Sequence, residues 1–288
     1  MNDSRLEKWL LAGPPMLFML ALFAVPAIIM LLASFRYPGE YGGLAPLTDP
    51  VHGFTLETYR FFFSDFIYTE VFIKSIAMAF FTTAFCLLLA YPLALVIARS
   101  PKRDALVLLV ILPFASNFLI RVYAWMILLG PQSALNVALN VILHWFGISS
   151  VHLLFSPFAV LVAMVYAHLP FMVLPLYANL IRHDPLLLDA AQDLGASAWQ
   201  RFWRVTFPLS LPGVYSGSAL VFIPALGMFV IPEILGGTGD MLIGNLIKEQ
   251  FLVTRDWPFG STLAILMTLA VMLIAWLAGR LGQGRRYA

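Results

Sequence analysis

The residue types that most often carry chemistry are few in this sequence, and their spacing matches no catalytic or metal site. Three histidines, His144, His152 and His168, are scattered without the spacing of metal ligands. The single cysteine, Cys86, lies inside an apolar run and is expected to act as a small buried hydrophobic residue. No glycine-rich loop ends in Lys-Ser or Lys-Thr, so the sequence predicts no nucleotide site. We therefore expect that the chain is not an enzyme and that it binds no metal or cofactor itself.

The composition indicates a membrane protein. Of 288 residues, 61% are hydrophobic and 11% are charged, whereas soluble domains carry about 25% charged residues. A soluble fold of this length could not cover its surface with so few polar side chains, but a bilayer is an apolar solvent. The net charge of +2 gives no reason to expect nucleic acid as a partner.

Six apolar stretches are long enough to cross a bilayer as helices, which takes about 20 residues each. The expected crossings are 9–35, 75–98, 105–129, 157–181, 213–231 and 258–279. The predicted fold is all-α, a single polytopic domain over 1–288 with six transmembrane helices and a cytoplasmic loop at 182–212. Prolines within these stretches are expected to mark bends: Pro92, Pro113, Pro170, Pro175 and Pro224.

The lysines and arginines predict the orientation. If the N-terminus is cytoplasmic, eleven of them lie inside: Arg5, Lys8, Arg99, Lys102, Arg103, Arg182, Arg201, Arg204, Arg280, Arg285 and Arg286. Five lie outside: Arg36, Arg60, Lys74, Lys248 and Arg255. This bias follows the positive-inside rule, so both termini are expected in the cytoplasm.

Two outside segments have distinct patterns. The segment 36–70 begins with turn signals, which are Pro38-Gly39, Gly42-Gly43 and Asp49-Pro50, and continues with an aromatic-rich stretch at 56–66 that is expected to lie against the outer interface. Between Gly130 and Pro157, apolar residues recur at helical spacing: Leu135, Leu139, Ile142 and Leu143. This second pattern predicts an interfacial or re-entrant helix.

The cytoplasmic loop has clear helix start and stop signals. Asp184 can cap a helix that begins at Pro185, because proline at the first helical position loses no needed hydrogen bond. Gly195 is placed to end this helix in the left-handed conformation. Ser197 and Gln200 form the pattern of a capping box for a second short helix.

Beyond the second helix, Pro208 and Pro212-Gly213 are expected to turn the chain into the fifth crossing. The first helix presents small side chains, Ala190 and Ala191, between two turns. Small side chains let backbones approach closely, so this surface suits docking into a groove on a partner.

This loop resembles a known family. The residues that carry the resemblance are Asp189-Ala190-Ala191, Leu194-Gly195-Ala196, Pro208-Leu209 and Pro212-Gly213. They resemble the signature loop of inner-membrane permeases of binding-protein-dependent ABC importers, except that the family's usual first residue is glutamate. In that family the loop is a coupling helix that sits in a cleft of a separate ATPase. The resemblance implies ATPase-coupling roles for Asp189, Ala190, Ala191, Asp193, Leu194, Gly195 and Ala196.

Further segments narrow the resemblance to spermidine/putrescine permease subunits. They are Leu112-Pro113-Phe114, Asn117, Leu119-Ile120-Arg121, Tyr123, Leu242-Ile243-Gly244-Asn245 and Arg255-Asp256-Trp257-Pro258-Phe259-Gly260. The resemblance implies the type I ABC importer permease fold in a bacterial inner membrane. It also implies two ATPase subunits that bind ATP and Mg²⁺, a second similar permease, and an outside polyamine-binding protein.

Polyamines are long cations, so a pathway for them needs carboxylates, carbonyl dipoles or aromatic faces. The candidate pathway residues are Glu233, Asp256, Trp257, Asn117, Tyr123 and Trp125. Each has an alternative interpretation: a solvated helix end for Glu233, interfacial anchoring for Asp256 and Trp257, and helix packing for the other three. Arg121 would repel a cation, so we expect it to stabilise the helices in an ion pair, with Glu233 as the candidate partner.

Two other functions remain open at this point. The same machine could carry another small solute, such as a different organic cation. A secondary transporter or membrane enzyme would be expected to show inverted repeats, intramembrane acidic residues or convergent catalytic groups, and none of these is visible in the sequence.

Overall fold

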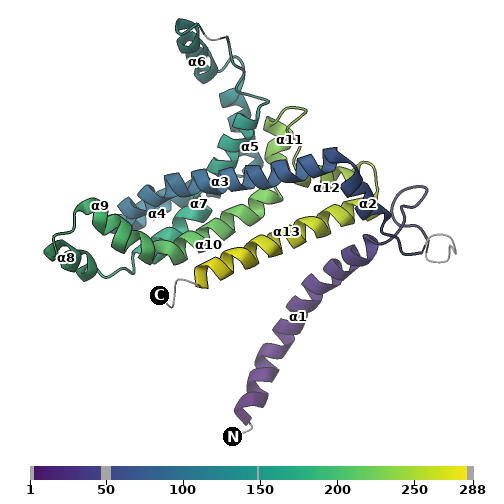
Figure 1. Ribbon diagram of the computed structural model, residues 1–288, viewed down its shortest axis with the longest axis horizontal. Helices are drawn as coiled ribbons and strands as arrows, with labels where there is room; N and C mark the ends of the chain where they lie inside the picture. The colour runs from purple at the N-terminus through teal and green to yellow at the C-terminus, as the bar shows by residue number, and fades with distance from the viewer. Residues whose placement is uncertain (1–2, 47–52, 148, 284–288) are drawn as a thin grey trace. The chain divides into compact units, whose positions relative to one another are not determined.

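The computed structural model describes residues 3–46, 53–147 and 149–283. The predicted turn at Asp49-Pro50 and the basic residues Arg285 and Arg286 lie outside these ranges. In the described part the chain is helical and has no strand, as predicted. The first elements are α1 (Asp3–Ala33), α2 (Glu57–Ser64), α3 (Phe66–Arg99), α4 (Arg103–Ile111), the 3₁₀ turn η1 (Leu112–Ala115), α5 (Phe118–Leu129) and α6 (Ala134–Trp145) (Figure 1). They are followed by α7 (Pro157–Leu180), α8 (Leu186–Asp193), α9 (Ala198–Arg201), the π-helical turn η2 (Phe202–Thr206), α10 (Phe207–Leu226), α11 (Val230–Leu235), α12 (Ile243–Leu252) and α13 (Trp257–Gln283).

Six helical segments of the described residues are long and apolar enough to cross a membrane. They are Ala12–Ala33, Phe66–Arg99, Phe118–Trp145, Pro157–Leu180, Ala198–Leu226 and Trp257–Leu277. The predicted all-α fold with six transmembrane helices is therefore confirmed. The helix of the second crossing begins nine residues earlier than expected, at Phe66, and the third and fifth crossings also differ.

The expected third crossing, 105–129, is not one continuous helix. It consists of α4, η1 and α5, separated by extended backbone at Ser116 and Asn117. Two local causes break it. Pro113 has no N–H for a continuing helix, and the Asn117 side chain accepts a hydrogen bond from the Leu119 N–H at 2.8 Å, which starts α5 as a new helix. The other prolines expected to mark bends lie inside uninterrupted helices: Pro92, Pro170, Pro175 and Pro224.

The expected fifth crossing, 213–231, begins earlier and ends earlier than predicted. Pro208 and Pro212-Gly213 do not turn the chain, because they lie inside α10. Pro208 occupies the first turn, where an N–H is not needed, and proline inside a membrane helix is tolerated. The helix ends at Leu226, and the chain is non-helical at Gly227 and Met228 before α11 begins.

The chain divides into two compact units, Met1–Thr69 with Leu246–Ile274 and Glu70–Asn245 with Ala275–Ala288. In the first unit, hydroxyl groups fix the end of α1. The Ser34 carbonyl accepts hydrogen bonds from Thr58 Oγ1 at 3.0 Å and Thr262 Oγ1 at 3.4 Å, which ties α1 to α2 and α13. The aromatic-rich stretch 56–66 forms α2, whose Phe61 ring contacts Phe259 edge-on at 5.3 Å.

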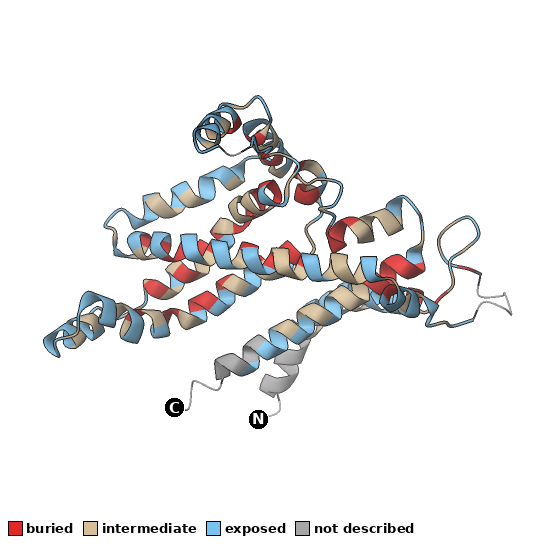
Figure 2. Ribbon diagram, turned by 45° about the horizontal axis from the view of Figure 1, so that its top comes forward, coloured by how far each residue is buried: buried red, intermediate tan, exposed pale blue. Residues whose placement is uncertain are grey.

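In the second unit α7 is the central helix, in contact with α4, α5, α10 and α11. Buried residues gather on the facing sides of α3, α7 and α10 (Figure 2). Glycine allows the close contact between α7 and α10: a Cβ at Gly217 would lie 2.7 Å from Met172 Sδ. Helices in lipid have no hydrophobic driving force for association, because lipid tails are as apolar as the side chains. They associate through close van der Waals packing, which small residues allow.

Candidate functional site

The local structure predicted for residues 184–200 is present. Asp184 Oδ1 accepts a hydrogen bond from the Leu186 N–H at 3.0 Å at the start of α8. Gly195 has φ +79° and ends the helix in the left-handed conformation. Ser197 and Gln200 form both hydrogen bonds of the capping box that starts α9, at 3.3 and 2.9 Å. The sequence signals therefore fix α8 as a short helix held between two caps.

The surface of α8 exposes apolar side chains. Leu194 is 89% exposed and Leu186 is 68% exposed, while Ala190 and Gly195 are also exposed. No atom lies within 4 Å of the position that a Cβ on Gly195 would occupy. The exposed face of α8 therefore combines two large apolar side chains with small residues.

Behind α8, an aromatic cluster joins the loop to the helical bundle. It consists of Trp199, Phe202, Trp203, Phe207 and Tyr91, with neighbouring ring centroids 5.0 to 6.3 Å apart. The Tyr91 hydroxyl also lies 2.7 Å from Ser210 Oγ in a buried hydrogen bond. Sequence reasoning did not single out Tyr91 or Ser210. Their signal was a polar hydroxyl within an apolar helix, which needs a buried partner.

The interruption of the fifth membrane helix positions Glu233. Glu233 lies in the first turn of α11, and its side chain is exposed. The Phe229 carbonyl oxygen accepts hydrogen bonds from the Glu233 N–H at 3.1 Å and from Asn245 Nδ2 at 2.9 Å. One carbonyl thus starts α11 and connects it to the beginning of α12.

Four consecutive residues, Leu242-Ile243-Gly244-Asn245, hold this junction together. Asn245 Oδ1 accepts a hydrogen bond from the Leu242 N–H at 3.3 Å, and the Asn245 side chain is buried, with 7% exposed. A Cβ at Gly244 would lie 2.7 Å from the Gly227 carbonyl oxygen, so only glycine fits this crossing of two backbones. The sequence pattern carries the family resemblance, but the pairing of Gly244 with Gly227 has no local signal in the sequence.

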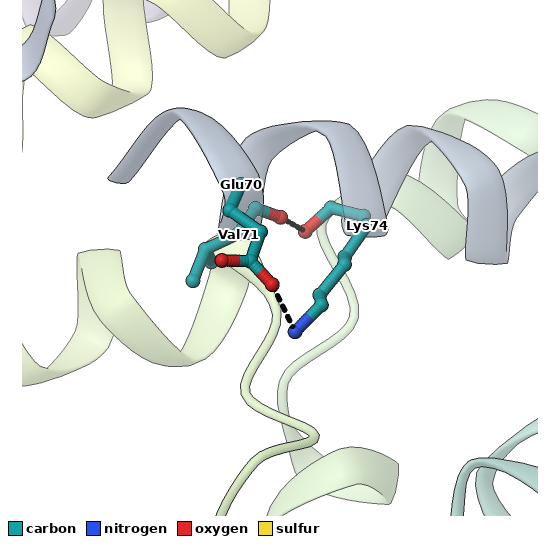
Figure 3. Close-up of polar contacts among 4 residues, drawn as sticks. Glu70, Val71 and Lys74 are labelled. Carbon is teal, nitrogen blue, oxygen red and sulfur yellow. Dashed lines mark hydrogen bonds and ion pairs between the residues drawn. The ribbon is translucent and has the colours of Figure 1, made fainter. Parts of the chain in front are cut away.

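Ser75 of α3 fixes the other side of the same segment. Its Oγ accepts a hydrogen bond from the Ile243 N–H at 2.7 Å and donates one to the Val71 carbonyl at 2.7 Å. On the same turn, Lys74 Nζ and Glu70 Oε1 form an ion pair at 2.7 Å (Figure 3). The positive charge of Lys74 is thereby balanced within its own helix.

The three candidates on α5 have different environments. Asn117 caps α5, so its side-chain oxygen is used by the helix itself. Trp125 packs edge-on against Tyr166 of α7, with ring centroids 5.5 Å apart, which fits the packing interpretation. Tyr123 is 48% exposed. Because α11 contacts α5 and α7, the structure brings the helix that carries Glu233 against the helix that carries Tyr123.

Arg121 lies on aromatic rings. Its guanidinium carbon is 4.3 Å from the Phe114 ring centroid and 5.8 Å from that of Phe118. Its Nε and Nη1 atoms are buried without a hydrogen-bond partner in the described part of the chain. The contacts found are therefore cation–π contacts, and the ion pair with Glu233 stays a prediction.

Asp256 and Trp257 belong to the other unit, at the start of α13. Asp256 Oδ1 accepts a hydrogen bond from the Phe259 N–H at 3.0 Å, so this carboxylate caps the helix. The signal was present in the sequence as Asp followed by Trp-Pro, since proline favours the first turn of a helix. Trp257 is 46% exposed, which leaves its ring available to a ligand or to the interface.

Comparison with known proteins identifies close relatives. The spermidine/putrescine transport system permease protein PotB of Escherichia coli (strain K12) is 43% identical over 235 residues, which cover 79% of this chain and 84% of that protein. PotB of Haemophilus influenzae is 42% identical over 224 residues, 76% of this chain and 77% of that protein. The molybdenum transport system permease protein ModB of Mycobacterium bovis is 31% identical over 214 residues, 74% of this chain and 77% of that protein.

A solved structure has the same fold. The bacterial alginate ABC transporter in complex with an alginate pentasaccharide-bound periplasmic protein contains a chain that matches with a TM-score of 0.72 and 19% identity, over 99% of this chain and 96% of that one. The family model described as binding-protein-dependent transport system inner membrane component matches residues 6–287. This chain is therefore an inner-membrane protein of that family, with the fold of type I ABC importer permeases.

Proposed function

We propose that this chain is the permease subunit of an ATP-driven importer for polyamines, namely spermidine and putrescine. The observation that carries the substrate class is the 43% identity to the PotB relatives over 79% of the chain. The molybdenum permease, which serves a chemically different solute, is 31% identical. The sequence of this chain is thus more similar to the PotB relatives, which are named for polyamines, than to the permease ModB, which is named for molybdenum.

Coupling to a separate ATPase is supported by α8. Asp184 binds the N–H at the start of this helix and left-handed Gly195 ends it; the helix exposes Leu186, Leu194 and Ala190, and Gly195 has open space around it. The aromatic cluster behind it connects η2 to Tyr91 of α3. Movement of a docked α8 would therefore reach the bundle through packed rings rather than through a flexible loop.

The complete importer would contain two ATPase subunits, a second homologous permease and an extracytoplasmic polyamine-binding protein. ATP and Mg²⁺ would bind to the ATPase subunits, because this chain has no nucleotide-binding loop in its sequence. The alginate transporter that shares the fold was crystallised with a periplasmic protein, which supports a binding-protein partner. Both termini and α8 would face the cytoplasm, as the excess of lysine and arginine on that side indicates.

The polyamine pathway would pass the exposed side chains of Glu233 and Tyr123. A carboxylate favours an ammonium group, and an aromatic face adds a cation–π contact. Trp125 and Asn117 would support α5 through packing and capping, while Asp256 and Trp257 would contribute at the outer end of α13.

The test is uptake by the reconstituted importer in proteoliposomes, with labelled spermidine, putrescine, molybdate and an amino acid as substrates. We expect ATP-dependent uptake of the polyamines alone. Uptake of another solute with no polyamine uptake would keep the permease function but refute the substrate class. A complex that transports nothing although it hydrolyses ATP in response to the loaded binding protein would contradict the assignment of the pathway to this chain.

A further inference from the structure

The helix α6 is polar on its inner side and apolar on its outer side. Asn136 is buried, with 2% exposed, and its Nδ2 donates a hydrogen bond to the Pro131 carbonyl at 3.1 Å. Asn140, one turn later, accepts a hydrogen bond from the Val151 N–H at 2.7 Å and donates one to the Val151 carbonyl at 3.1 Å. The Asn136 amide therefore binds the turn before the helix, and the Asn140 amide fastens the loop after it.

The opposite face of α6 consists of exposed apolar side chains. They are Ala134, Val137, Ala138, Val141, Ile142 and Trp145, followed by Phe146 after the helix end. Trp145 is 89% exposed and Phe146 is 77% exposed. An amphipathic helix on a protein in water has the reverse arrangement, with its apolar face on the core. The environment that covers α6 must therefore be apolar.

The charge distribution identifies this environment. From Val122 to Ile181 the sequence contains no Asp, Glu, Lys or Arg. A loop that protrudes into water or docks on a water-soluble protein would be expected to carry charge, and the rim of a protein–protein interface is polar. Tryptophan and other aromatic residues instead concentrate at the membrane–water interface. This evidence favours lipid over a protein partner.

The position of α6 in the fold decides between two possible third crossings. Helix α5 has 12 residues and is about 18 Å long, too short to cross about 30 Å of hydrocarbon alone. It must be extended either by α4 or by α6. Both α4 and α5 contact α7, which is one of the six membrane helices, whereas α6 contacts α5 and lies at its far end (Figure 1). The series α4, η1 and α5 is about 40 Å long, which is sufficient.

We propose that α4, η1 and α5 form the third crossing, and that α6 lies flat in the membrane interface with its apolar face in the lipid. The partner of this face is a phospholipid surface. Trp145 and Phe146 anchor the tip, and the hydrogen bonds of Asn140 to Val151 keep the loop on the polar side. This inference concerns α6 alone, so it does not depend on which solute is carried.

The test is the depth of single-cysteine labels in the assembled importer in phospholipid nanodiscs. Cys86 is completely buried and can be replaced by alanine to give a background without thiols. A fluorophore is attached at Val141→Cys on α6. Leu88→Cys, which is 66% exposed near the middle of the expected crossing 75–98, serves as the deep control, and Gly239→Cys, where the backbone faces open space, serves as the aqueous control. Quenching is measured with lipids that carry a nitroxide near the headgroup or near the chain end, and with iodide in water.

We expect the label at Val141 to be quenched several-fold more by the headgroup-proximal nitroxide than by the chain-end nitroxide, with the opposite ratio at Leu88. Iodide should quench the label at Gly239 most. Chain-end quenching at Val141 as strong as at Leu88 would show that α6 crosses the bilayer, and would overturn the proposal. Iodide quenching as strong as at Gly239, or protection from every quencher by a neighbouring subunit, would also overturn it.

Discussion

Replacing Asn245 by alanine should alter the position of Glu233 indirectly, through the hydrogen bonds that hold the start of α11. The side chain of Asn245 makes two hydrogen bonds, one to the Phe229 carbonyl at 2.9 Å and one from the Leu242 N–H at 3.3 Å. Alanine removes both. The Phe229 carbonyl keeps the Glu233 N–H as a donor, but the Leu242 N–H is left without its side-chain acceptor. The start of α11 thus loses its connection to α12.

The expected magnitude follows from these two bonds. Each is worth about 1 kcal/mol, and somewhat less between membrane helices, while an unpaired buried N–H adds a penalty of about 1 kcal/mol or more. The junction between α11 and α12 therefore loses about 2 kcal/mol of local stability. This loss lowers the ratio of its ordered to its disordered state by up to roughly thirtyfold. Polyamine uptake at limiting substrate concentration should fall about threefold to thirtyfold.

A matched control separates this effect from general destabilisation. Asn140→Ala also removes an asparagine that makes two hydrogen bonds to backbone, at 2.7 and 3.1 Å to Val151, but α6 carries no proposed pathway residue. We expect Asn140→Ala to lower the thermal unfolding midpoint in detergent by a smaller amount, because its bonds to Val151 are exposed and leave no buried group unpaired. Only Asn245→Ala should lower the initial rate of labelled spermidine uptake in proteoliposomes.

A double variant tests whether Asn245 acts through Glu233. If it does, adding Asn245→Ala to Glu233→Gln should cause little further loss, because residues that act as a unit are not additive. Two losses that multiply would refute this reasoning and show that Asn245 supports transport by another route. Unchanged uptake by Asn245→Ala alone would show that the junction at Phe229 is not needed.

Three further predictions concern the pathway, the docking helix and the topology. Glu233→Gln should slow polyamine uptake and leave assembly of the complex intact. If Glu233 only neutralises Arg121, the double variant with Arg121→Gln should restore transport. An unaltered uptake rate for the single variant would remove Glu233 from the pathway. Gly195→Trp should abolish ATP-coupled uptake while the subunit still inserts into the membrane. The control Gly147→Trp, with a similar φ of +70° and equally open surroundings, should retain uptake. Equal uptake by both variants would exclude docking through Gly195. Reporter fusions at Gly147 and Gly237 should report the outside and a fusion at Gly195 the cytoplasm, and a cytoplasmic report at Gly147 would contradict the topology.

The sequence predicts the local structure of residues 184–200 well because its signals are local. A cap at Asp184, a left-handed glycine at Gly195 and a capping box at Ser197 each depend on residues within one or two turns. Such signals act through the backbone of the same segment, so tertiary packing does not override them. The composition was equally informative, since six long apolar stretches can satisfy their backbone in lipid only as helices.

The interruptions of the membrane helices were harder to predict. Hydropathy is continuous through Pro113 and through Gly227, so apolar length alone gives two unbroken crossings where the structure has breaks. The break at Gly227 depends on Gly244 and Asn245, about 17 residues later in the chain, which close on it through backbone contact and a side-chain amide. A single sequence gives no means to pair such distant residues. Asp256 and Asn117 show the opposite failure, because their capping role was local and could have been recognised from the residues that follow them.

The exposed apolar surfaces of α8 and α6 differ in charge, and this difference bears on the kind of partner each needs. The surface of α8 lies among ionisable residues, with Asp189 and Asp193 on the helix itself, so it can remain in water until a protein with a polar rim covers it. The surface of α6 has comparable exposed apolar side chains but no Asp, Glu, Lys or Arg from Val122 to Ile181. Nothing there would keep the surface soluble or give a protein partner specificity through charge. This difference in charge supports the two proposals, an ATPase as the partner of α8 and lipid as the surroundings of α6.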